Sequence, residues 1–171
     1  VLALNRVIEE GYFDRNLWEF YGMGSVSNIE SIKLAGDVSM KLLQRVTLKK
    51  YAELLPGFDV GMSLMFTPHP SLPPLEMAAA GLIVVTNTFE NKTASRLQAI
   101  SPNIIAVEPS VDGVSRGLIA ALEKVHDFRG RIAGSHVKWS KDWSESFNDK
   151  IMTNIKGFIS AEEAEQICSR S

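Results

Sequence analysis

The sequence predicts an α/β protein in which helices cover both faces of a parallel β-sheet. The first observation is that two apolar runs, over 58–65 and 82–87, have the near-continuous hydrophobicity of strands buried on both faces. Second, segments with helical spacing of apolar residues alternate with such runs along the chain. Third, turns rich in glycine and proline separate the two kinds of segment. This alternation is typical of parallel strands joined by crossover helices.

The first 65 residues are predicted to contain, in order, helix 1–8, strand 17–24, strand 31–36, helix 48–55 and strand 58–65. Apolar residues recur at helical spacing in the first helix, and Gly11 would end it. Thr47 is suited to cap the second helix, which stops before Pro56. The first strand would run into a glycine turn at Gly22 and Gly24.

The following stretch, up to residue 125, is predicted to contain helix 73–80, strand 82–87, helix 92–100, strand 104–107 and helix 111–125. Pro73 and Pro74 suit the first positions of a helix, where a missing N–H costs least. Ser110 would cap the last helix. In parallel sheets ligands bind beyond the carboxyl ends of the strands. The glycine turn and the loop after Met65 would both lie at that edge.

The C-terminal part, 139–171, is predicted to form amphipathic helices distinct from a first domain over 1–138. One long helix, capped by Ser140, would carry an apolar stripe at Trp143, Phe147, Ile151, Ile155, Phe158 and Ile159. Ser160 and Glu163 match a capping box for a final helix that ends near Cys168. These helices are expected to pack on the first domain or on a domain outside this chain.

Composition argues against several classes of protein. The 171 residues carry a net charge of −2 with a pI near 6.0, so we expect no broad basic surface for nucleic acid or an anionic membrane. No apolar run approaches the roughly 20 residues of a membrane-spanning helix. The single Cys168 excludes an intrachain disulfide, which is typical of cytoplasmic proteins, and the 3 histidines lack the spacing of metal ligands. The first residues include no initiator Met, so we expect one domain of a longer polypeptide.

The stretch 65–81, "MFTPHPSLPPLEMAAAG", joins a loop stiffened by prolines to a helix that opens on Glu76. The N–H groups that follow the prolines, those of Leu75, Glu76 and Met77, would be unpaired at the positive end of the helix. Such an end favours an anion such as diphosphate. Glu76 has two interpretations: a first-turn acid favoured by the helix dipole, or a carboxylate that accepts hydroxyl groups of a ribose or deoxyribose.

Residues 51–92, "YAELLPGFDVGMSLMFTPHPSLPPLEMAAAGLIVVTNTFENK", resemble the donor-binding half of a GT-B glycosyltransferase. The match is closest to a bacterial rhamnosyltransferase-like branch with the pattern PHPS–PPLEMAA–G–VVTN–NK, and it extends more weakly over 17–158. The resemblance implies a Rossmann-like domain, the C-terminal half of a GT-B fold, whose substrate is a nucleoside diphosphate sugar without a further cofactor. The partner would be an N-terminal acceptor domain of the same polypeptide. The reaction would transfer a sugar, for example rhamnose, in surface-polysaccharide assembly in the cytoplasm or at the inner face of the membrane.

On this resemblance, the donor-binding residues are Gly22, Gly24, Thr47, His69, Pro70, Ser71, Pro74, Leu75, Glu76, Asn87 and Lys92. Glu76 would hold the ribose, the loop from His69 would surround the diphosphate and the sugar, and the residues around Thr47 would lie near the base. Asn87 and Lys92 would face the same crevice. His69 is the candidate for a catalytic role, with a solvent-facing loop histidine as the alternative.

Two departures from the family pattern affect these expectations. Many retaining GT-B enzymes carry a second glutamate eight positions before the ribose-binding one, where this chain has Pro68. The basic residue that usually neutralises the diphosphate would precede Val1. Two alternative functions stay open, a nucleotide-sugar 2-epimerase and a non-catalytic nucleotide- or sugar-binding scaffold. The base, the sugar, the acceptor and the stereochemical outcome stay open as well.

Overall fold

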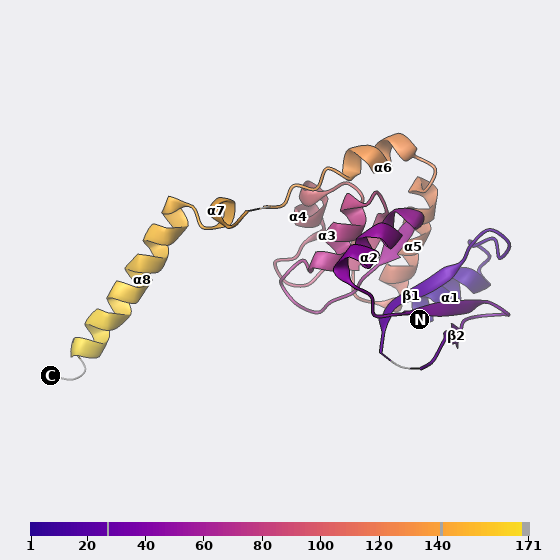
Figure 1. Ribbon diagram of the computed structural model, residues 1–171, viewed down its shortest axis with the longest axis horizontal. Helices are drawn as coiled ribbons and strands as arrows, with labels where there is room; N and C mark the ends of the chain where they lie inside the picture. The colour runs from indigo at the N-terminus through magenta and orange to yellow at the C-terminus, as the bar shows by residue number, and fades with distance from the viewer. Residues whose placement is uncertain (27, 141, 169–171) are drawn as a thin grey trace. The chain divides into compact units, whose positions relative to one another are not determined.

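The structure, a computed structural model, describes residues 1–26, 28–140 and 142–168, with side chains described up to residue 159 (Figure 1). The chain divides into two compact units, Val1–Val137 and Lys138–Ser171. The larger unit contains two small β-sheets and most of the helices. The smaller unit contains two helices only, among the residues described.

The larger unit begins with α1 (Leu2–Glu9), β1 (Phe20–Ser25), β2 (Ser31–Lys33), β3 (Ser39–Gln44), α2 (Leu48–Leu54) and a 3₁₀ turn, η1 (Leu55–Gly57). It continues with β4 (Val60–Met62), α3 (Leu72–Ala79), β5 (Ile83–Asn87), α4 (Ala94–Ile100), β6 (Ile104–Val107), α5 (Val111–Lys124) and α6 (Phe128–Gly134). The caps predicted at Thr47 and Ser110 are confirmed, because their hydroxyl groups accept N–H bonds from Lys50 (3.3 Å) and Gly113 (3.0 Å).

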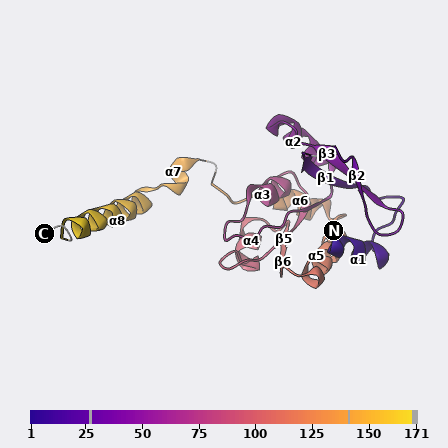
Figure 2. The ribbon, with the colours of Figure 1, turned by 90° about the horizontal axis from the view of Figure 1, so that it is seen from below.

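The first sheet is parallel and has the strand order β4-β5-β6; Figure 2 labels β5 and β6 in it. All five residues of the central strand β5 are buried. Ile83 and Val85 pack towards α5, whereas Val84 belongs to the apolar cluster formed with α3 and α4. Helices therefore cover both faces of a parallel sheet, and the predicted Rossmann-like α/β fold class is confirmed.

The second sheet is mixed and has the order β1-β3-β2, with β1 parallel to β3 and β2 antiparallel to it. The sequence pattern gave no indication of β3, which lies in the middle of this sheet. Gly22 pairs with Leu42 inside β1, and the register shifts by a bulge between Met23 and Ser25. Gly24 at the bulge has φ +85°, a conformation that glycine adopts without strain. The predicted glycine turn is therefore wrong: it is a bulged strand.

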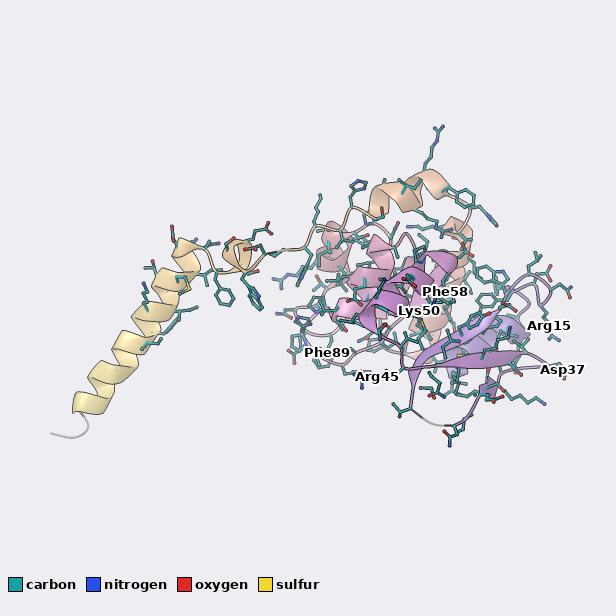
Figure 3. All side chains as sticks on the ribbon, in the orientation of Figure 1. Arg15, Asp37, Arg45, Lys50, Phe58 and Phe89 are labelled. Atoms are coloured by element: carbon teal, nitrogen blue, oxygen red, sulfur yellow. The ribbon has the colours of Figure 1, made fainter. Side chains whose placement is uncertain are left out.

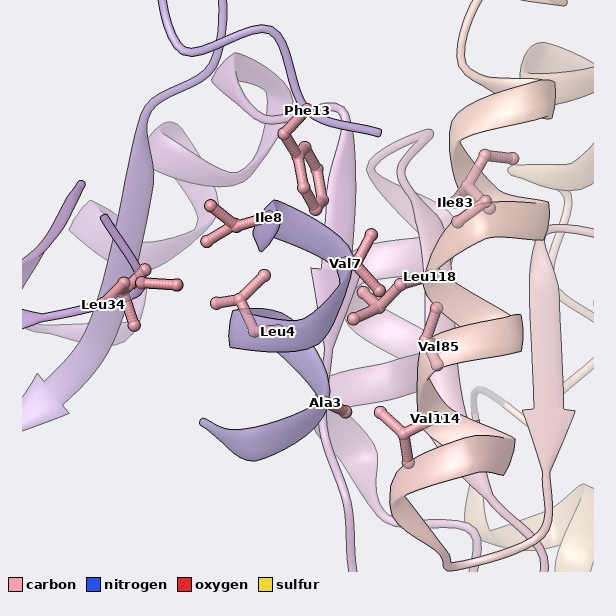
Figure 4. Close-up of a cluster of buried hydrophobic side chains, with 12 residues drawn as sticks. Ala3, Leu4, Val7, Ile8, Phe13, Leu34, Ile83, Val85, Val114 and Leu118 are labelled. Carbon is pink, nitrogen blue, oxygen red and sulfur yellow. The ribbon is translucent and has the colours of Figure 1, made fainter. Parts of the chain in front are cut away.

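Helix α1 packs beside α5, which covers one face of the parallel sheet (Figure 4). Val7 and Ile8 are fully buried, and they share one apolar cluster with Leu34 from the side of the mixed sheet and Val85 from the parallel sheet. The side chain of Asn5 accepts a hydrogen bond from the N–H of Ala35 (3.0 Å), which ties α1 to the segment between β2 and β3. Helix α1 therefore belongs to an apolar cluster that includes residues from both sides of the unit.

Two predicted boundaries in this unit need correction. The strand expected over 58–65 is shorter, because β4 ends at Met62 and the chain then leaves the sheet as an exposed segment. The sequence also gave no indication of α6, which Asp127 caps. The guanidinium of Arg131 on α6 donates to the carbonyl of Gly81 (2.8 Å) and to the carboxylate of Asp59 (2.9 Å). These bonds hold α6 beside the start of β5.

The smaller unit contains α7 (Trp143–Ser146) and α8 (Asp149–Cys168). The long helix predicted from Ser140 is wrong, because Asp142 caps α7 and the helix breaks before Asp149. No new helix begins at Ser160, since α8 runs through that position, and the side chains from 160 onward lie outside the described residues. Within the described part of the chain, every helix is too short or too polar to serve as a membrane span.

Candidate functional site

A cavity of about 630 Å³ lies in the larger unit, with walls from both sheets. The mixed sheet contributes β1 from Phe20 to Gly24, residues of β3 and the segment after it, and the parallel sheet contributes β4. Helices α2 and α3 complete the wall with Leu48, Tyr51, Pro73 and Glu76. Figure 3 labels Arg45, which follows β3, and Phe58, which precedes β4; both line the cavity.

The turns of α3 decide which of its residues reach this cavity. Glu76 and Met77, three and four positions after Pro73, line the wall with it, whereas Pro74 and Leu75 are buried and do not line it. Of the predicted donor-binding residues on α3, the structure therefore places Glu76 at the cavity and places Pro74 and Leu75 in the apolar core.

Glu76 on α3 and Tyr51 on α2 line the same cavity. Tyr51 is half-buried, and its pKa is raised by burial first, then by the negative charge of Glu76 and a hydrogen bond to it. A phenolate next to a carboxylate is disfavoured, so the hydroxyl keeps its proton and remains a donor. Both side chains add polar groups to an otherwise largely apolar wall.

The start of α3 differs from the expectation. The helix begins at Leu72, so the N–H of Leu75 points back at the carbonyl of Ser71 and has an acceptor within the helix. The predicted set of unpaired amides from Leu75 to Met77 is therefore wrong. Leu72 supplies the one N–H of the first three helical positions, because Pro73 and Pro74 have none.

The residue before this helix is held in an unusual conformation. Ser71 has φ +70° and ψ 148°, a region that non-glycine residues rarely adopt. Its N–H donates to Nδ1 of His69 at 2.9 Å. Since Nδ1 accepts this bond, the neutral imidazole carries its proton on Nε2. The described residues that line the cavity do not include His69, Pro70 or Ser71.

Asn87 and Lys92 bind the backbone of Met65, in the loop 63–71 before α3. Asn87 is fully buried; its Oδ1 accepts from the N–H of Met65 at 2.7 Å, and its Nδ2 donates to the carbonyl of Met65 at 3.1 Å. Nζ of Lys92, also buried, donates to the same carbonyl at 2.6 Å, and burial lowers the pKa of this lysine. The structure thus places both predicted donor contacts beneath the loop, bound to the backbone of one residue, Met65, and neither lines the 630 Å³ cavity.

The other predicted residues lie around the cavity. Gly22 and Gly24 line it, and an added Cβ at Gly24 would meet no atom within 4 Å. Thr47 caps α2, and its two neighbours, Val46 and Leu48, are part of the wall.

Sequence reasoning missed Arg45 and Tyr51. Among the described lining residues, Arg45 is the one lysine or arginine. Its position would have followed from recognising β3, since Arg45 comes directly after that strand. No local sequence pattern predicted a role for Tyr51, because its place on the cavity wall near Glu76 depends on how α2 and α3 pack.

Two comparisons with known proteins bear on this site. A stretch of 56 residues is 48% identical to the O-antigen biosynthesis protein RfbC of Myxococcus xanthus, and it covers 33% of this chain and 4% of that protein. Residues 1–119, which include Glu76 and all the strands, match the family described as WsaF, C-terminal domain. Since this match covers well over half of the sequence, the chain belongs to the WsaF C-terminal domain family and is a glycosyltransferase-like α/β domain.

Proposed function

We propose that the unit Val1–Val137 binds the nucleotide-sugar donor of a glycosyltransferase in the cavity between its two sheets. The carboxylate of Glu76 accepts one or both hydroxyl groups of the donor's ribose or deoxyribose. The observation that carries the proposal is the position of Glu76: an acidic side chain on the wall of a 630 Å³ cavity, in a member of the WsaF C-terminal domain family.

The size and lining of the cavity support a ligand of this class. Small-molecule sites typically have volumes of about 300–1,000 Å³ and apolar walls with a few polar groups. Val46 and Leu48 offer apolar surface for a base on the side of the mixed sheet. The open backbone at Gly24 lets a ligand approach the main chain closely.

We assign the diphosphate to Arg45. Its guanidinium is the one basic group among the described lining residues, and a guanidinium matches two phosphate oxygens at once. In sugar transfer, negative charge develops on the diphosphate as it leaves. A fixed positive charge near it stabilises that transition state.

The reaction in this proposal moves a sugar from a nucleoside diphosphate to a hydroxyl acceptor, with no further cofactor. An N-terminal domain outside this chain supplies the acceptor site. The pattern over 51–92 supports rhamnose as the sugar, and the similarity to an O-antigen biosynthesis protein of Myxococcus xanthus supports a role in bacterial surface-polysaccharide assembly. The proposed role is in the cytoplasm or at the inner face of the membrane.

Binding measurements on the full chain test the proposal. Isothermal calorimetry, with ligand-observed NMR for weak complexes, is run with thymidine, uridine and guanosine diphosphates. We expect binding of at least one of them, and Glu76→Gln to weaken it about tenfold or more, because a hydrogen bond to a charged group is lost. The matched control is Glu123→Gln, an exposed glutamate on α5 away from the cavity, which keeps the affinity. Failure of the folded wild-type chain to bind any of the three, or equal affinity of Glu76→Gln, overturns the proposal.

A further inference from the structure

The 630 Å³ cavity is bordered by the free edges of two strands. Among the described strands, β1 pairs with β3 alone and β4 pairs with β5 alone, so each has one unpaired edge. Successive side chains of a strand point to opposite faces, so a cavity on one face would be lined by every second residue. Here consecutive residues line it, 20–24 of β1 and 60–62 of β4. Both strands therefore present an edge to the cavity.

The backbone of β4 directs polar groups at this cavity. On the side of β5, the N–H of Ser63 donates to the carbonyl of Val85 at 3.1 Å, and the carbonyl of Asp59 accepts from the first residue of β5 at 3.0 Å. Every second residue of a strand bonds to the same parallel neighbour, so Val60 and Met62 direct their N–H and C=O groups the opposite way. Such groups on an uncovered edge are a template for another strand.

The cavity also has the layers of a covered sheet. Leu4 from α1 and Leu118 from α5 line it, and both belong to one apolar cluster (Figure 4). Leu55 from η1 and Met77 from α3 line it as well, and both belong to the other cluster. These two clusters cover opposite faces of β5. A strand between β1 and β4 would therefore be buried on both faces, which requires a near-continuous apolar run.

The position of Val1 indicates which segment can reach this gap. Val1 lines a second hollow of about 280 Å³ together with Met62, at the end of β4, and Asn87, at the end of β5. It therefore lies at the carboxyl edge of the parallel sheet. A strand that runs parallel to β4 in the gap would end at this same edge, beside Val1. That strand, α1 and β1 would form a βαβ unit, the usual connection between parallel neighbours.

We propose that the gap between β1 and β4 accepts a β-strand from the polypeptide directly N-terminal to Val1, which joins the two sheets into one. This inference goes beyond the proposed function, because it concerns completion of the sheet and needs no ligand. The added strand pairs with both free edges and buries its side chains against both apolar clusters. It leaves to the donor the part of the cavity beyond the strand ends, next to Gly24 near the end of β1 and Arg45 after β3.

Amide hydrogen exchange, followed residue by residue by NMR, tests the inference. It compares the chain 1–171 with the same chain extended by about ten residues of the natural sequence that precedes Val1, enough for a strand and a turn. The internal control is Gly61, whose N–H faces β5 in both chains. Relative to Gly61, we expect Val60 and Met62 to exchange at least about tenfold more slowly in the extended chain, because their N–H groups gain acceptors.

Two further extensions separate strand pairing from added length. An extension of the same number of Gly and Ser residues stays flexible and should leave the relative rates as they are in 1–171. Aspartate at two central positions of the natural extension should abolish the protection, because it would bury charges between two apolar clusters. Circular dichroism verifies that each chain is folded.

Three results would overturn the proposal. The first is equal relative rates in 1–171 and in the natural extension, and the second is equal protection by the Gly and Ser extension. The third is protection of Val60 and Met62 in 1–171 that rises with protein concentration, which would show that a second copy fills the gap. All rates are measured without nucleotide, so they are independent of whether Glu76→Gln changes nucleotide affinity.

Discussion

The two sheets on either side of the cavity have the same number of strands but are built differently. In the parallel sheet, all five residues of β5 are buried between α5 on one face and α3 and α4 on the other. In the mixed sheet, all three residues of β2 are exposed, and the central strand β3 is only half-buried. The parallel sheet is therefore the stable frame of the domain, and the mixed sheet is a lightly covered wall of the site.

The difference extends to how each sheet carries its polar residues. On the parallel side, buried Asn87 and Lys92 fix the loop that leads to α3, so the helix bearing Glu76 starts from a set position. On the mixed side, Arg45 follows an exposed strand end and is itself exposed. We infer that the frame positions the carboxylate, while the wall supplies a cation that can adapt to the ligand.

The largest expected effect is on stability and compares matched truncations in the two sheets. Val84→Ala in β5 removes fully buried methyl groups and should lower the free energy of unfolding by about 2–3 kcal/mol. Ile32→Ala in β2 removes more atoms, but the side chain is 37% exposed, so the loss should stay below about 1 kcal/mol. Urea unfolding followed by circular dichroism measures both. An equal loss for the two variants would mean that the mixed sheet is as much a part of the frame as the parallel one.

The contrast between frame and wall also explains what the sequence predicts and what it does not. β5 and β6 were predicted correctly because burial on both faces requires a continuous apolar run, which is visible locally. β3, "SMKLLQ", was missed because a half-covered strand keeps polar residues such as Lys41 and Gln44. The caps at Thr47 and Ser110 were predicted because capping involves only neighbouring residues.

The candidate site was predictable to the extent that it depends on one segment. Glu76 was identified from the pattern around it, and the structure places it on the cavity wall. Tyr51 lines the same cavity from another helix, and the burial of Lys92 results from the path of the loop over it. Neither follows from spacing along the chain, since both depend on how separate elements pack.

The second-largest expected effect is on the binding of a nucleoside diphosphate. It tests whether the mixed-sheet wall supplies the positive charge for the diphosphate. Arg45→Gln should weaken the binding of a nucleoside diphosphate about tenfold at low salt, because a charge-assisted contact to phosphate is lost. The loss should shrink as salt is raised, since an exposed charge is screened. Calorimetry at two salt concentrations measures this, with Arg129→Gln on α6 as the exposed control that keeps the affinity. The same loss for the uncharged nucleoside would show that Arg45 contacts the base or ribose.

The smallest expected effect is on the pH dependence of the free energy of unfolding, to which buried Lys92 contributes. Burial lowers its pKa in the folded protein, so between that value and the unfolded value of about 10.4 the unfolded chain binds more protons. Stability contributed by this residue therefore rises with pH across that window. Lys92→Met should flatten the rise between pH 8 and 10 and change stability at pH 7 by no more than about 1 kcal/mol, because Asn87 still donates to the carbonyl of Met65. Urea unfolding at a series of pH values measures the slope, and the exposed control Lys124→Met should keep it. A slope that survives in Lys92→Met would mean that the lysine stays charged beneath the loop, so that the frame carries a positive charge under the Met65 carbonyl throughout the physiological range.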